Sequence, residues 1–246
     1  MVVFATLAAP ERRRLARRRR AAPPQPEPEP VSTQRVTVIE LGRPLADARQ
    51  AERWLAQAGE EELGRGLAVL NRTLHAFRLV CADPAIGPVS REAALVARVG
   101  YGAGEQVADG LWTEAFELVA RAPRRSRARV LAPQARLAAV LGGRERALAC
   151  EELILRARLD VDHDRPREAA LQLLVALDAA LAELAVEPRA GELRERLAEL
   201  DGHRDEVAEI AQAALAGPLS SAQLDALTRT LVRLESALRA RAVLNA

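Results

Sequence analysis

The sequence predicts an all-α fold in which helical hairpins pack as a bundle or short solenoid. The chain ends in an antiparallel, heptad-patterned helix pair and begins with a disordered N-terminal tail. Hydrophobic residues make up 49% of the 246 residues but aromatic residues only 2%, so the core must consist mainly of Leu, Val and Ala packed helix on helix. Apolar residues recur at helical spacing from Pro44 onward. Glycine and proline residues separate these segments.

The first residues differ in composition from the rest. Residues 1–30 contain seven arginines, at 12–14 and 17–20, followed by a proline-rich stretch. Closely spaced prolines prevent regular helix and favour an extended, solvated chain. We therefore expect a tail over 1–34 and a helical domain over 35–246, with a second interpretation that divides this domain near 143 into 35–142 and 143–246. Another interpretation of the tail is that translation starts at Val31.

The elements of the domain follow in order. Residues 34–40 alternate like a short strand, but no second strong strand follows with which it could pair. Gly59 and Pro84 end the first two expected helices, Ser90 caps the third, and Asp164 caps the helix that Pro166 opens. Helices are expected at about 46–58, 60–82, 91–100, 112–121, 125–141 with a break at Pro133, 144–159, 165–185, 190–215 and 220–244.

Leucines in the last expected helix form the clearest regular pattern of the chain. They alternate spacings of three and four residues, at Leu224, Leu227, Leu231, Leu234 and Leu238. This heptad spacing predicts a seam that packs against another helix. We favour an internal pairing with the preceding helix, because Gly217 and Pro218 permit a tight return, and keep a homodimer seam as the alternative.

Two segments resemble fragments of tetratricopeptide repeats, residues 110–122 and residues 164–176. The positions that match the small and apolar residues of that family are Ala103, Ala115, Val119 and Ala122 in the first and Ala157, Ala169, Leu173 and Ala176 in the second. The segments lie 54 residues apart, whereas the repeat of the family is about 34 residues long. The resemblance implies stacked helical hairpins over about 95–182, with a groove for a peptide or helix of another protein and without catalysis.

Motifs for catalysis and cofactors are incomplete, so we expect neither a cofactor nor a metal site. The glycines of 100–104 suggest a phosphate loop, but Glu105 stands where the dinucleotide pattern needs its last glycine. Close helix contact or a turn explains these glycines better. His163 and Asp164 superficially resemble the signature pair of HD metal phosphohydrolases, which would be an enzyme alternative, while a polar turn explains the same residues.

Arginines between Glu117 and Glu145 are not interrupted by any carboxylate. They are Arg121, Arg124, Arg125, Arg127, Arg129, Arg136 and Arg144. Guanidinium groups bind phosphate in bidentate geometry, so the first five are the candidate anion-binding residues. All 36 basic residues of the chain are arginine, which indicates codon bias and weakens every arginine motif. We favour pairing of this cluster with the acidic residues of the 190–215 helix, or a solvated face, over anion binding.

These observations predict a non-enzymatic, cytoplasmic bacterial protein whose helical hairpins bind another protein or a second copy of the chain. Tyr101 and Trp112 are the candidate binding residues, because rare aromatics make effective anchors; burial in the core is the alternative, and we favour it for Trp112. Nonspecific nucleic-acid binding by the arginine clusters is the second hypothesis. We expect no membrane span, and the isolated Cys81 and Cys150 are expected to be reduced thiols.

Overall fold

A computed structural model describes residues 1–7, 33–42, 44–119, 134, 136–187 and 190–244. The chain divides into two compact units, Met1–Ala122 and Pro123–Ala246. Helices contain most of the described residues, and the second unit is a helical bundle, so the predicted fold class is confirmed. The boundary between the units lies near residue 122 and not near 143, because residues 136–148 belong with the bundle.

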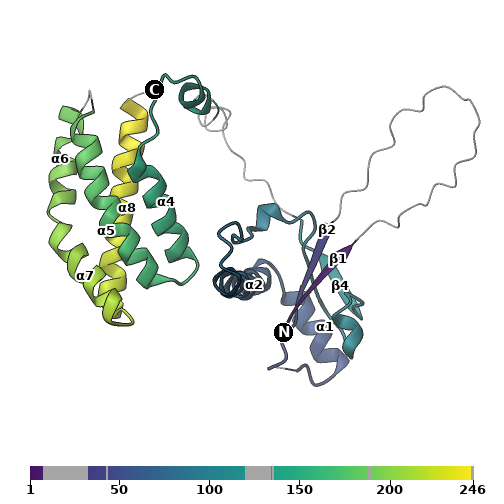
Figure 1. The fold of residues 1–246 in the computed structure, drawn as a ribbon. Helices are drawn as coiled ribbons and strands as arrows, with labels where there is room; N and C mark the ends of the chain where they lie inside the picture. Colours follow the sequence, from purple (N-terminus) through teal and green to yellow (C-terminus); the bar gives the residue numbers. More distant parts are fainter. Residues whose placement is uncertain (8–32, 43, 120–133, 135, 188–189, 245–246) are drawn as a thin grey trace, which may run out of the picture. The chain divides into compact units, whose positions relative to one another are not determined.

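The first unit contains two strand hairpins as well as two helices (Figure 1). In chain order its elements are β1 (Val2–Leu7), β2 (Thr33–Val38), α1 (Ala48–Gln57), α2 (Glu60–Cys81), the 3-10 turn Arg91–Ala93, β3 (Arg98–Tyr101), the 3-10 turn Glu105–Val107 and β4 (Glu114–Glu117). Strands β1 and β2 pair antiparallel, as do β3 and β4.

The strand predicted at 34–40 has a partner, which precedes it in the chain. Val2 pairs with Val38 and Leu7 pairs with Thr33, so β1 and β2 form a hairpin whose connection is residues 8–32. The expectation of an unstructured tail is therefore wrong for residues 2–7, which follow the β-favouring alternation of Val, Phe and Thr. Residues 8–32 lie outside the described part of the chain.

The helices α1 and α2 confirm the first two predicted helices. The Asp47 carboxylate accepts a hydrogen bond from the Gln50 amide at 2.7 Å and caps α1. At the start of α2 the Gly59 amide donates to Glu62 at 2.6 Å, and this bond lowers the pKa of Glu62. Leu55 and Leu70 are buried, whereas Phe77 is exposed.

Residues 91–100 and 112–119, the described parts of two ranges predicted as helices, contain no α-helix. A single 3-10 turn and β3 occupy the first range, and β4 occupies the second. Gly102, Gly104 and Gly110 lie between the two ranges and let the chain turn back, so residues 98–101 and 114–117 pair as strands. Gly104 and Gly110 also have positive φ, which a helix does not accommodate.

The second unit is an antiparallel helical bundle (Figure 1). Its helices are α4 (Ala149–Asp162), α5 (Pro166–Ala185), α6 (Ala190–Asp201), α7 (Arg204–Ala216) and α8 (Ser221–Leu244). α6 and α7 follow one another along one side of the bundle, so the helix predicted at 190–215 is interrupted at Gly202 and His203. α5 contacts each of the other four helices. α8 also contacts all four of the others.

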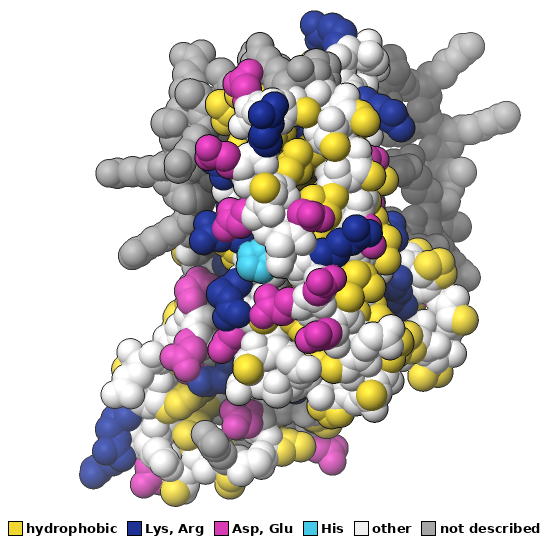
Figure 2. Space-filling view, turned by 90° about the vertical axis from the view of Figure 1, so that its left-hand side faces the viewer, with side chains coloured by type: hydrophobic (Ala, Val, Ile, Leu, Met, Phe, Trp, Pro, Cys, Tyr) yellow, Lys and Arg dark blue, Asp and Glu magenta, His cyan; other side chains and the backbone are white. Residues whose placement is uncertain are grey.

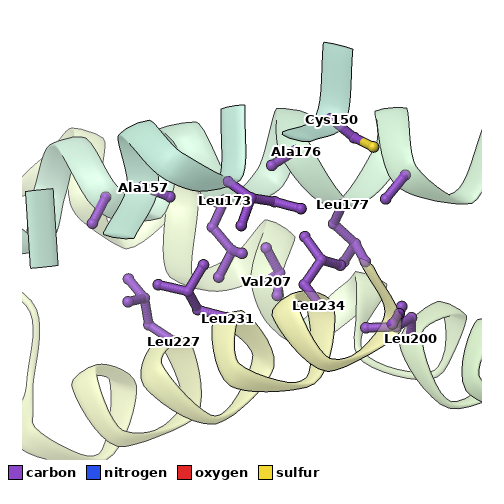
Figure 3. Packing of buried hydrophobic residues seen from close by; sticks show 14 of the residues in the cluster. Cys150, Ala157, Leu173, Ala176, Leu177, Leu200, Val207, Leu227, Leu231 and Leu234 are labelled. Atoms are coloured by element: carbon purple, nitrogen blue, oxygen red, sulfur yellow. The ribbon is translucent and has the colours of Figure 1, made fainter. Parts of the chain in front are cut away.

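The bundle core consists of leucine, valine and alanine side chains (Figure 3). Leu173 and Leu177 of α5 point toward the leucines of α8, of which Leu231 and Leu234 have no exposed surface. The heptad seam of α8 therefore packs inside its own bundle, where α8 contacts α4, α5 and α6 as well as the preceding helix α7, so the predicted pairing with the preceding helix is only part of the packing. A homodimer through this seam would require the bundle to open.

Candidate protein-interaction sites

The β3–β4 hairpin brings the two candidate aromatic residues together. Tyr101 ends β3, and its carbonyl oxygen accepts a hydrogen bond from the Thr113 amide at 2.9 Å, next to Trp112. Both aromatic side chains are half-buried, so neither lies fully in a core. Phe116 pairs with Val99 on the ladder, which adds a third aromatic residue to the same hairpin. Three of the six aromatic residues of the chain thus lie within 101–116.

Glycines let the two strands of this hairpin approach closely. A Cβ atom at Gly100 would lie 2.4 Å from the Cβ atom of Ala115, and one at Gly102 would lie 2.6 Å from Cγ2 of Val107. Both distances are shorter than any van der Waals contact. The glycines therefore serve a turn, as expected, but the close contact is between strands and not between helices, because the preceding segment is a strand of a hairpin.

The Tyr101 hydroxyl faces acidic side chains. It donates to Oε2 of Glu114 at 3.1 Å, on the opposite strand. Burial raises the pKa of Tyr101, and the hydrogen bond and negative charge of Glu114 add to this, with a smaller contribution from Glu52 of α1. These effects favour the neutral phenol of Tyr101.

The two segments that resemble tetratricopeptide repeats fold differently. The first, at 110–122, contains β4, so the predicted helical hairpin is wrong there. The second lies at the turn between α4 and α5, and its matching residues lie at the helix contact. Ala157, Ala169 and Ala176 have no exposed surface and allow the two helices to approach closely.

His163 and Asp164 lie in the turn between α4 and α5. Nδ1 of His163 lies 2.8 Å from the Leu159 carbonyl oxygen, and Asp164 has a positive φ of 56°. Asp164 is therefore a turn residue, and the predicted cap of α5 is wrong, because Arg165 precedes Pro166 as the cap residue. Within the described residues, no group of three or more His, Cys, Asp or Glu side chains gathers as metal ligands would.

The five candidate anion-binding residues lie outside the described part of the chain. They are Arg121, Arg124, Arg125, Arg127 and Arg129. Of the same run, Arg136 is described, and it bonds to Glu145 at 2.9 Å and to Glu151. The hydrogen bond to Glu145 raises the pKa of Arg136. Arg136 thus pairs internally, with acidic residues of its own unit that precede the 190–215 segment.

A buried ionic cluster joins the same carboxylates to α8. Arg241 is 3% exposed and lies 3.5 Å from Glu145, 3.3 Å from Glu151 and 3.3 Å from Glu187. Carboxylates neutralise this guanidinium on three sides, so the cluster ties α4, α5 and α8 together and is not an anion site. Breaking such a buried group costs about 3–5 kcal/mol because it leaves an uncompensated charge.

A neighbouring carboxylate holds the start of α4. Glu183 of α5 accepts hydrogen bonds from the Ala149 amide at 3.0 Å and the Cys150 amide at 2.9 Å. Burial opposes ionisation of Glu183, but these bonds together lower its pKa. Burial raises the pKa of the Cys150 thiol to about 12, and Glu183 adds to this. A thiol that stays protonated is a poor nucleophile.

A surface that the sequence analysis missed lies on the outer side of α5. α5 is apolar on almost every side, a property typical of a fully buried helix, yet one side of it faces solvent. Leu171, Val175 and Val186 are 37%, 54% and 83% exposed, and Ala179 and Ala182 lie between them at helical spacing. We call these five residues the α5 stripe. The largely apolar run from 171 to 186, interrupted by Gln172, Asp178 and Glu183, was the signal that could have revealed it.

The outer side of α8 has the opposite character. Arg229 pairs with Glu206 at 3.8 Å and Arg233 pairs with Glu199 at 3.2 Å, so arginines of α8 meet acids of α6 and α7. Figure 2 views the molecule from the α6 and α7 side, where acidic and basic side chains are interspersed. The face shown is mixed in charge and is unlike the uniformly basic surface that nucleic-acid binding favours.

Comparison with known proteins found no matching family model, no matching curated protein and no matching solved structure. The tetratricopeptide resemblance therefore has no support beyond the residues that suggested it. None of the described helices combines the length and apolar character that a membrane span requires.

Proposed function

We propose that this protein is a non-enzymatic interaction protein that binds another protein through the β3–β4 hairpin. One observation carries the proposal: Tyr101 and Trp112, two of six aromatic residues, belong to the same β3–β4 hairpin and are half-buried. Side chains in this state keep their orientation because their bases are packed, and still offer apolar surface to a partner. Tyr and Trp are the residues that most often dominate binding energy at protein interfaces.

Rigidity of the hairpin supports the same proposal. The Gly100 and Ala115 backbones are in direct contact, and Arg91 bonds to the Leu118 carbonyl oxygen beyond the end of β4. A binding residue on a rigid element loses little conformational entropy when a partner docks. Tyr101 and Trp112 therefore suit a recognition role better than the exposed apolar residues of the surrounding loops.

The test is affinity purification of the full-length chain from its native host after mild crosslinking. We expect Tyr101→Ser and Trp112→Ser to lose a partner that the unmodified protein recovers in stoichiometric amount. Phe77→Ser is the matched control, because Phe77 is an aromatic residue of the same unit that is 55% exposed on α2. The control should retain the partner.

Recovery of the same partners by the Tyr101 and Trp112 variants would refute the assignment of the hairpin. Measuring the ratio of nucleic-acid to protein absorbance at low and high salt tests the second hypothesis in the same preparation. Copurifying nucleic acid that salt releases would favour the arginine clusters instead, because phosphate contacts weaken steeply with ionic strength.

A further inference from the structure

We propose that residues 136–143 are a detachable strap, which Arg136 fastens to the helical bundle and which high ionic strength releases. The inference goes beyond the proposed function, because it concerns a conformational change of the second unit and leaves the β3–β4 hairpin of the first unit unchanged. Charge holds the strap in place, a second arginine keeps the bundle intact when the strap leaves, and two glycines at its end let it move.

Ion pairs of a single arginine fasten the strap. Arg136 lies 2.9 Å from Glu145 and also bonds to Glu151, in the first turn of α4. The leucines of the strap contribute little apolar burial, because Leu137 and Leu141 are 58% and 78% exposed. The Arg136 side chain is itself 39% exposed, so salt screens its attraction to the two carboxylates. The contact between strap and bundle is therefore weak and sensitive to ionic strength.

Release of the strap leaves both carboxylates neutralised. Arg241 of α8 lies 3.5 Å from Glu145 and 3.3 Å from Glu151, and it is 3% exposed. When Arg136 departs, Arg241 remains beside the two carboxylates, so no buried charge is left without a partner. The ionic cluster that joins α4, α5 and α8 therefore stays in place, and opening of the strap is separate from unfolding of the bundle.

Glycines at the end of the strap form its hinge. Gly143 has a positive φ of 68°, and a Cβ atom there would meet nothing within 4 Å, so no neighbouring side chain obstructs a backbone rotation. In the closed arrangement the amides of Gly142, Gly143 and Arg144 donate to carbonyl oxygens of residues 138–140 at 2.9–3.1 Å. All three residues are exposed, so water can replace these hydrogen bonds when the strap opens.

Opening of the strap lengthens the connection between the two units. The strap precedes α4, and the chain that leads to it comes from Met1–Ala122. Eight extended residues span roughly 26 Å, so release gives the unit that contains the β3–β4 hairpin a longer reach. The strap thus regulates how far the two units can move apart.

Hydrogen exchange of the full-length chain, followed by mass spectrometry at low salt and at about 1 M salt, tests the strap. We expect Arg136→Gln at low salt to speed exchange of the 142–145 amides at least about tenfold, and high salt to do the same in the unmodified chain. Arg156→Gln is the matched control, because Arg156 is 58% exposed and pairs with Glu152 of its own helix. This control should leave the 142–145 amides unchanged.

A second variant tests the hinge without changing the ion pairs. Gly143→Ala places a Cβ atom on a residue with positive φ, so the closed turn is strained although no neighbour is displaced. It should speed exchange of the same amides while exchange within α5 and α8 stays slow. Unchanged exchange in Gly143→Ala would overturn the hinge.

Two results would overturn the strap itself. One is exchange of the 142–145 amides that neither Arg136→Gln nor high salt changes. The other is an Arg136→Gln variant in which exchange within α5 and α8 speeds up equally, since residues 136–143 would then open only together with the bundle. Neither result affects the proposed function, because partner capture depends on Tyr101 and Trp112 of the other unit. Conversely, loss of that assignment leaves the exchange measurement unchanged.

Discussion

In both the helical hairpin α4–α5 and the strand hairpin β3–β4, two backbones approach each other closely. The small residues that permit this approach differ between the two hairpins. In α4–α5 the approach depends on alanines such as Ala157 and Ala176, which have no exposed surface. In β3–β4 it depends on Gly100, whose Cα faces Ala115 with no room for a Cβ atom. Alanine stabilises a helix and glycine destabilises it, so the type of small residue favours a helical hairpin in one segment and a strand hairpin in the other.

The difference teaches that small residues at a fixed spacing do not specify a helical hairpin. Both segments have alanines seven residues apart with an apolar residue between. Only the second has Pro166 at the start of its second helix and lacks glycine within both helices. The spacing of the alanines therefore does not predict a helical hairpin by itself, and the positions of proline and glycine around them must be considered as well.

The largest effect is expected from overfilling the helical hairpin. Ala176→Leu adds three carbon atoms at a position without exposed surface and should lower the free energy of unfolding of the second unit by about 2–3 kcal/mol. Urea unfolding followed by far-ultraviolet circular dichroism measures this loss. Ala185→Leu, at the exposed end of the same helix, should change stability by less than about 0.5 kcal/mol. Equal stability of the two variants would show that α4 and α5 do not pack closely at Ala176.

A smaller loss is expected from the equivalent change in the strand hairpin. Gly100→Ala places a Cβ atom 2.4 Å from that of Ala115 and 2.5 Å from the Glu114 carbonyl oxygen, so the strands must separate. We expect a loss of about 1–2 kcal/mol in the first unit. Tryptophan fluorescence follows this unit alone, because both tryptophans of the chain, Trp54 and Trp112, lie in Met1–Ala122.

Gly66→Ala is the control for the strand hairpin. Gly66 lies within α2, where an added Cβ atom meets nothing within 4 Å, so alanine should stabilise the unit by about 0.5–1 kcal/mol. Opposite signs for the two glycine variants are the expected result. A stabilising Gly100→Ala would contradict the close strand contact.

The fold of the second unit could be predicted from the sequence because its signals are local. Gly217 and Pro218 separate the last two helices, and the leucine spacing of α8 identifies the buried side of that helix. The interruption at Gly202 was not predicted, since one glycine within a helical pattern is usually tolerated. In the first unit the pairing of β1 with β2 spans a connection of 25 residues, which no local pattern reveals.

The candidate sites were predicted less completely. Tyr101 and Trp112 were chosen for their rarity, and only the β3–β4 pairing shows that they share one hairpin. The α5 stripe was missed because a largely apolar helix is normally buried, and which of its sides faces solvent depends on where α4 and α7 pack. Residue type therefore selected the candidate aromatic residues, and tertiary contacts were needed to define the surfaces on which they lie.

The smallest effect expected is a shift in the ionisation of Tyr101, the single tyrosine of the chain. Burial and the neighbouring Glu114 raise its pKa above the ordinary value of about 10. Phenolate absorbance measured during an alkaline titration reports this residue directly.

Glu114→Gln should lower the midpoint of the Tyr101 titration only in part, because burial contributes most to the shift. Glu105→Gln, outside the ladder, should leave the midpoint unchanged. A raised pKa favours the neutral phenol in the folded state, so this stabilisation is complete below the pKa of the unfolded chain and is lost as pH rises through the folded value. An ordinary midpoint in the unmodified protein would mean that Tyr101 is freely solvated and that the hairpin does not hold it as described.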